Sequence, residues 1–226
     1  MAFNKFVKEL NGNRVEGELL HSIFYSLLTS FAILGGLYYF FFQNIENFMP
    51  KYGIFMFLSA LSYAFFIAIV RQVRAYEEFA CMAGMMIGMT AGMMGFLPGF
   101  YVASTNGMFI GGFFGVAIGM FLGVWTGKSC GIMGIMEGMM ASLMGGLMGA
   151  MTAFMLFNDN LIVAAVLVFI ICAVILSGLS YMIYFEMKDN DRGKKENHFL
   201  SVGLTAALTL ITVAVMLHGP RSAIFS

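Results

Sequence analysis

Sulfur-bearing side chains form a regular row in the segment 131–151, which reads GIMGIMEGMMASLMGGLMGAM. In a helix, residues three or four positions apart lie on one face, so this row shares a face with Cys130 and with the single acid, Glu137. Thioether sulfur is an uncharged, soft ligand that selects Cu(I) among physiological ions. The pattern therefore predicts a soft-metal site, with Cu(I) as the candidate ion and with Met133, Met136, Met140, Met144 and Met148 as ligands.

A second row lies in the preceding glycine-rich stretch and consists of Met82, Met85, Met86, Met89 and Met93. Cys81 precedes this row as Cys130 precedes the other, and thiolates bind soft metals more tightly than thioethers. We expect the two cysteines to converge at the cytoplasmic mouth of a path between the rows. The pairing of MxxxM with GxxxG helices resembles the trimeric copper-uptake family. The resemblance covers that pairing alone and implies passage of Cu(I) between weak thioether sites. This chain has seven predicted spans, whereas that family has three.

Glu137 lies inside a run that otherwise suits lipid. A carboxylate within a membrane span costs about 2.5–3.5 kcal/mol on insertion scales, so we expect it to face a protein interior, an aqueous cavity, a partner helix or a bound cation. Two interpretations stay open beside metal transport. Flexible methionine next to glycine suits the packing surface of a structural or assembly subunit in a larger membrane complex. Alternatively, Glu137 carries protons or cations across the membrane.

The elements that must position these side chains are membrane-spanning helices. The chain is 60% hydrophobic and 11% charged, with a mean hydropathy of +0.87, whereas soluble domains carry about 25% charged residues. A helix needs about 20 apolar residues to cross the hydrocarbon core. The sequence therefore predicts an all-α, polytopic bundle of seven transmembrane helices, at 22–43, 53–70, 79–97, 105–126, 129–157, 161–185 and 199–217.

The polar segments set the boundaries and the orientation. Residues 1–20 are predicted to be a cytoplasmic amphipathic segment, 21–218 the membrane domain and 219–226 a short external tail. Ten of the 12 Lys and Arg residues lie on the side of the N-terminus, which predicts a cytoplasmic N-terminus because cytoplasmic loops carry the excess of basic residues. Pro98 and Gly99 are expected to end the third span and to leave LPGFYVASTNG as an external loop.

Residues 80–155 differ in composition from the rest and hold 16 of the 22 methionines and 18 of the 27 glycines. Glycines spaced by four let helix backbones approach closely in a membrane. We therefore expect the third to fifth spans to form a Gly/Met-rich inner layer, with the bulkier spans around it. The stretches GMMIGMTAGMMG, from Gly84, and GMMASLMGGLMG, from Gly138, match at both ends. Duplication of a helix and chance similarity of two abundant residue types both remain open as explanations.

Motifs of catalysis are missing from the sequence: there is no P-loop, no HExxH, no CxxCH and no serine–histidine pair with a plausible acid. We expect a protein that is not an enzyme. The net charge is +0, so nucleic acid is not an expected partner. The expected partners are the lipid bilayer and either further copies of the chain or other membrane subunits. The expected location is a prokaryotic-type plasma membrane, with the chain as a multi-pass protein.

Overall fold

The computed structural model describes residues 15–39, 52–75, 82–186 and 198–221. Over these ranges the chain is all-helical, as predicted, and contains no strand. The seven helices are α2 (Val15–Leu37), α3 (Ile54–Ala75), α4 (Met82–Asn106), α5 (Met108–Gly127), α6 (Gly131–Met155), α7 (Leu161–Glu186) and α8 (His198–His218), with a short 3-10 turn, η3 (Lys128–Cys130), between α5 and α6. The surface segment expected before residue 15 and most of the basic loop residues lie outside the described ranges.

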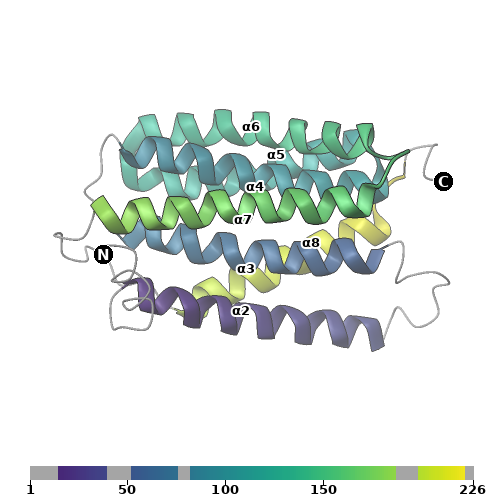
Figure 1. The fold of residues 1–226 in the computed structure, drawn as a ribbon, viewed down its shortest axis with the longest axis horizontal. Coiled ribbons are helices and arrows are strands. Elements are labelled where there is room, and N and C mark those ends of the chain that lie inside the picture. Colours follow the sequence, from purple (N-terminus) through teal and green to yellow (C-terminus); the bar gives the residue numbers. More distant parts are fainter. Residues whose placement is uncertain (1–14, 40–51, 76–81, 187–197, 222–226) are drawn as a thin grey trace.

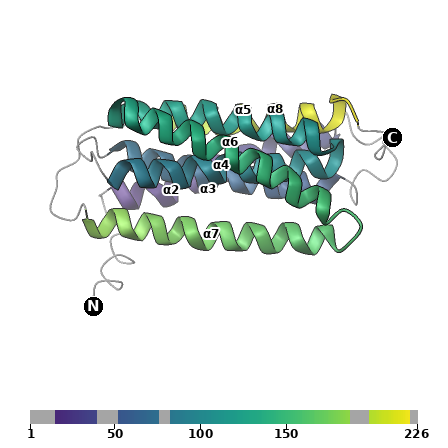
Figure 2. The same cartoon turned by 90° about the horizontal axis from the view of Figure 1, so that it is seen from above.

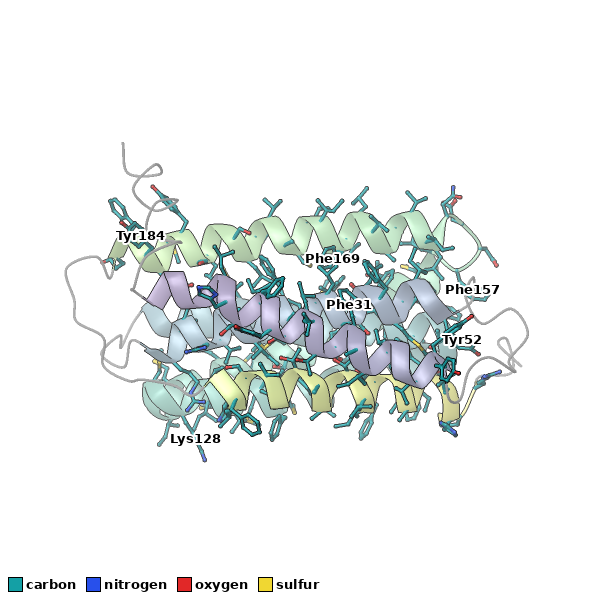
Figure 3. All side chains as sticks on the ribbon, turned by 90° about the horizontal axis from the view of Figure 1, so that it is seen from below. Phe31, Tyr52, Lys128, Phe157, Phe169 and Tyr184 are labelled. Atoms are coloured by element: carbon teal, nitrogen blue, oxygen red, sulfur yellow. The ribbon has the colours of Figure 1, made fainter. Side chains whose placement is uncertain are left out.

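Six of these helices, all except α4, are long and apolar enough to cross a membrane. Several such helices in one chain are typical of a multi-pass integral membrane protein. Successive helices run in opposite directions, so α2, α4, α6 and α8 point one way and α3, α5 and α7 the other (Figure 1). Lys128 and Tyr184, at helix ends predicted to be cytoplasmic, lie at the same end of the bundle, and Tyr52 and Phe157 lie at the opposite end (Figure 3).

The most buried helix is α3, which contacts α2, α4, α7 and α8. Within its apolar span 78% is buried, compared with 39% in α5 and 33% in α6. The expected inner layer is therefore wrong for α5 and α6, which lie at one edge of the bundle, whereas α4 lies between them and the other helices (Figure 1). The physical reason is that the buried side of α6 consists of glycine, serine and alanine, which leaves its bulky side chains on the outer side. Helix α5 buries Phe114, Ile118 and Leu122 but turns Phe109, Phe113 and Phe121 outward.

Pro98 does not end the third span, because α4 continues through it to Asn106. Proline removes one backbone N–H from the helical ladder and usually breaks or kinks a helix. Here the segment after it is held by tertiary packing, since Phe100, Tyr101 and Val102 are each 0% exposed. The expected loop LPGFYVASTNG is instead the last turns of a buried helix, and only Gly107, with φ 113°, breaks it from α5. Glycine suits this break because its φ lies where other residues are strained.

Helices α4, α5 and α6 pack backbone against backbone through their glycines, as the spacing predicted. A Cβ added at Gly115 would lie 2.5 Å from the Gly95 carbonyl oxygen, and one at Gly123 would lie 2.8 Å from that of Gly138. Helix α5 runs antiparallel to α4 and α6, which are parallel to each other, and each of the three helices contacts the other two. Gly92 and Ala141 mark the direct α4–α6 contact, with 3.5 Å between a Cβ at Gly92 and the Ala141 oxygen.

Gly115→Ala should destabilise the protein, because its new methyl group would meet the backbone of α4, which cannot rotate away. Gly178→Ala is the matched control: it lies on α7, where an added Cβ meets nothing within 4 Å, and alanine is the better helix former by about 1 kcal/mol. Thermal unfolding of the purified variants in detergent measures the difference. We expect a lowered midpoint for Gly115→Ala only; equal midpoints would contradict the glycine contacts.

Candidate functional site

The methionine row of α6 lies on the outer surface of the chain. Glycine and serine fill the buried side of this helix, at Gly134, Gly138, Ser142, Gly146 and Gly149. On the opposite side the exposed fractions are 70% for Met133, 61% for Met136, 67% for Met140, 62% for Met144 and 61% for Met148. We call these five residues, together with Glu137, the methionine face. The sequence correctly grouped them on one side of a helix.

The second row, on α4, has a different environment. Met86 is buried, with 3% exposed, Met93 is half-buried against the core, and Met89 is 46% exposed. Nothing is described for Cys81 or for the side chains of Met82 and Met85. Because α4 and α6 meet through their small residues, at Gly92 and Ala141, the structure does not enclose the two rows in one interior path. Only Met89 shares the exposure of the α6 row.

Glu137 is half-buried at the edge of the methionine face, on the side of α6 that turns toward α4. Its Oε2 atom is buried and has no hydrogen-bond partner among the described residues. One turn before the Gly92–Ala141 contact, Gly88 lies at about the depth of Glu137 in the parallel helices. A Cβ added at Gly88 would meet no atom within 4 Å. The packing around α4 is therefore looser at the depth of Glu137 than at Gly92, although Oε2 of Glu137 is itself buried.

Cys130 lies two helical turns before Glu137, in the turn that joins α5 to α6 and outside the spans. Burial raises the pKa of its thiol, and the negative charge of Glu137 raises it further. Glu137 therefore lies close enough to Cys130 for its charge to act on the thiol. Among the described residues there is no cluster of three or more His, Cys, Asp or Glu that would hold a metal ion, so a metal on this face would depend on thioether ligands.

A set of buried hydroxyl groups was missed by the sequence interpretation. The buried residues in the described part of α2 are Ser22, Ser26 and Ser30, and α8 buries Ser201, Thr205, Thr209 and Thr212. Each set repeats at three or four positions, which was the available signal. Serine and threonine are common at the contacts between membrane helices, so their regular spacing alone does not distinguish a special set from ordinary packing.

Comparison of the chain with protein family models, with curated protein sequences and with solved structures finds no match.

Glu137→Gln should speed the alkylation of Cys130. The carboxylate charge raises the thiol pKa, so its removal lowers that pKa and increases the thiolate fraction at any pH below it. The measurement is the iodoacetamide rate against pH, in protein whose other two cysteines are replaced by alanine. Ser177→Ala on the outer surface of α7 is the control. If the alkylation rate of Glu137→Gln depends on pH as that of the wild type does, the charge of Glu137 does not act on the Cys130 thiol.

Proposed function

We propose that this chain is a non-catalytic, multi-pass membrane subunit that binds another membrane-embedded chain through the methionine face. In this proposal all seven helices cross the membrane and the N-terminus is cytoplasmic. The alternating helix directions support the topology. The ten-to-two distribution of Lys and Arg in the sequence supports the orientation.

The observation that carries the proposal is the contrast between the two similar segments of α4 and α6. In the ungapped match that starts at Gly84 and Gly138, Met86 corresponds to Met140 and Met94 to Met148. The α4 methionines are 3% and 0% exposed, whereas their α6 counterparts are 67% and 61% exposed. Helices α3, α7 and α8 contact α4, and none of them covers the corresponding side of α6. A partner chain on α6 would bury the second segment as the first is buried.

The methionine face also differs from the other outward surfaces of the bundle. The outer side of α5 presents Phe109, Phe113 and Phe121, and α7 presents mostly Ile, Val and Leu, which suit lipid. Methionine is unbranched and adapts to irregular partners. Glu137 adds a reason to exclude lipid, because a carboxylate facing acyl chains is costly. Protein is a better neighbour for this face than lipid on both counts.

Cu(I) binding is the second candidate, favoured by a specific arrangement of sulfur. Met136 and Met140 lie one turn apart and are both exposed, and Met89 is exposed at a similar depth on the parallel helix. Thioethers of this kind are Cu(I) ligands, and a docked chain would complete their coordination. The third interpretation, proton or cation passage through Glu137, draws support from its unpartnered oxygen alone.

Photocrosslinking inside native membranes tests the docking proposal. A photoreactive residue at position 140 should give a discrete protein adduct, because the proposed partner covers this site. The matched control is position 174 on α7, since Val174 and Met140 are 65% and 67% exposed but only one lies on the methionine face. An adduct of twice the chain mass would identify a second copy as the partner. Lipid adducts alone at position 140 would refute docking.

The copper candidate is tested by replacing Met136 and Met140 with leucine, which removes two sulfur ligands at nearly constant volume and costs under about 1.5 kcal/mol in stability. Cu(I) is measured in the membrane-extracted protein purified under reducing conditions. We expect the double variant to lose bound Cu(I) and to keep its unfolding midpoint. Leucine at Met108 and Met120 of α5 is the control. A wild-type protein without Cu(I), or equal metal in both variants, would exclude the candidate.

A further inference from the structure

Glu137 has no positive charge beside it in the helices that pack against it. Helix α6 packs mainly on α4, α5 and η3, and neither α4 nor α5 contains a Lys, Arg or His. Within α6 Glu137 is the only charged residue. Lys128, in η3, precedes α6, whereas Glu137 lies six residues after the first residue of the helix, about 9 Å along its axis. The carboxylate therefore lies inside the span without a counter-charge from these elements.

The hydroxyl groups of the same helices are used within each helix. Thr90, Thr126 and Ser142 each donate a proton to a carbonyl oxygen four residues earlier in their own helix. A hydroxyl group has one proton to donate, so none of the three is available to a carboxylate in this arrangement. This agrees with the state of Glu137, whose buried Oε2 atom has no hydrogen-bond partner among the described residues.

The Glu137 side chain can be reached from the outer side of α6. It is half-buried, and Met136 and Met140, its neighbours on the methionine face, are 61% and 67% exposed. Helix α6 lies at the top of the bundle in Figure 1 and in front of α4 in the view from that side (Figure 2). The terminal torsion of a Glu side chain is broad, so either carboxylate oxygen can turn toward a donor that lies outside the chain.

A second copy of the chain does not bring a positive charge to this place. The described ranges contain four Lys and Arg residues: Arg71, Arg74, Lys128 and Arg221. Arg71 is 3% exposed and donates to Ser22, and Arg74 lies over the Trp125 ring, 4.3 Å from its centre. The other two lie outside the spans. The described surface of a second copy therefore has no accessible basic residue at the depth of Glu137.

We propose that the partner of the methionine face is a different membrane chain, and that a membrane-spanning helix of this partner carries a Lys or Arg at the depth of Glu137. The inference rests on the proposed function and adds the chemistry of the partner. An ionised side chain within a membrane span is costly for either chain alone, and such residues pair with one another. A bond between two ionised groups is about twice as strong as a neutral one. The pairing of Glu137 with the basic residue sets the depth at which the partner helix docks.

Photocrosslinking from position 140 in native membranes, one turn from Glu137, tests this pairing. The yield of the protein adduct should fall several-fold in Glu137→Gln, because the amide keeps the shape of the side chain and removes its charge. Glu186→Gln is the matched control, since Glu186 is exposed at the end of α7, and it should keep the wild-type yield. Mass spectrometry of the adduct should place the cross-link in a membrane span of the partner, within about one turn of a Lys or Arg.

Charge exchange between the two chains follows from the identified span. Glu137→Lys should abolish the adduct, and replacement of the partner's basic residue by Glu in the same cells should restore it. An adduct that keeps its yield in Glu137→Gln, or a partner span without Lys or Arg, would overturn the pairing and leave the proposed docking intact. An adduct of twice the chain mass would overturn the assignment to a different chain. Lipid adducts alone in the wild type would refute the docking itself.

Thermal unfolding of the purified chain in detergent distinguishes this role of Glu137 from a structural one. Because Oε2 has no hydrogen-bond partner among the described residues, Glu137→Gln should leave the unfolding midpoint unchanged while it lowers the adduct yield. Gly115→Ala provides the comparison, since it should lower the midpoint through contacts within the chain. A midpoint that falls in Glu137→Gln would assign the carboxylate to the packing of this chain and would overturn the proposal.

Discussion

The close approach of α4, α5 and α6 at glycine is the constraint on which the rest of the structure depends. A Cβ at Gly119 would lie 2.9 Å from the Ser142 Cβ and 3.0 Å from the Gly95 Cα, so the contact positions accept no larger residue without displacement of a helix. Because one face of α6 must be small, its bulky side chains gather on the opposite face, which lies outside the chain. The outward position of the methionine face is in this sense a consequence of the small residues on the buried side of α6.

Two kinds of interface meet at α3 and α4. On one side, glycine brings backbones together, and van der Waals contact is the main attraction, since burial from lipid gives no hydrophobic gain. On the other, α2 docks on α3 and α8 with three buried serines and turns Phe24, Tyr25 and Leu28 outward. An aromatic contact, Phe31 on Phe57 with 5.3 Å between ring centres, supplements the serines. The glycine interface is fixed by shape, whereas the serine interface combines close packing with the bond from Arg71 to Ser22 and the 3.5 Å pair of Ser30 and Thr209.

The sequence predicted the helices well and their environments poorly. Apolar length located all seven helices, and the period of the helix placed Met133, Met140 and Glu137 on one side. A helical period gives only relative directions, however, and it does not say whether a face points to protein or outward. The acid suggested an inward face, yet the glycines opposite it form the packed side. The expectation that Pro98 ends a helix was wrong for a related reason. Proline is a local helix-breaking signal, and here the burial of Phe100 and Tyr101 outweighs it. That burial depends on the other helices, so a short stretch of sequence does not show it.

The difference between the two similar segments bears on the role of Glu137. In the same ungapped match, the residue of α4 that corresponds to Glu137 is Ala83. The segment that this chain covers with its own helices thus has alanine at that position, and the segment left on the outside has a carboxylate. The Glu137 side chain is half-buried, and its buried Oε2 atom has no hydrogen-bond partner among the described residues, an arrangement that is costly for a carboxylate within a membrane span. Under the proposed function the partner that meets the outer side of α6 would offset this cost, which makes Glu137 the most informative single residue of the methionine face.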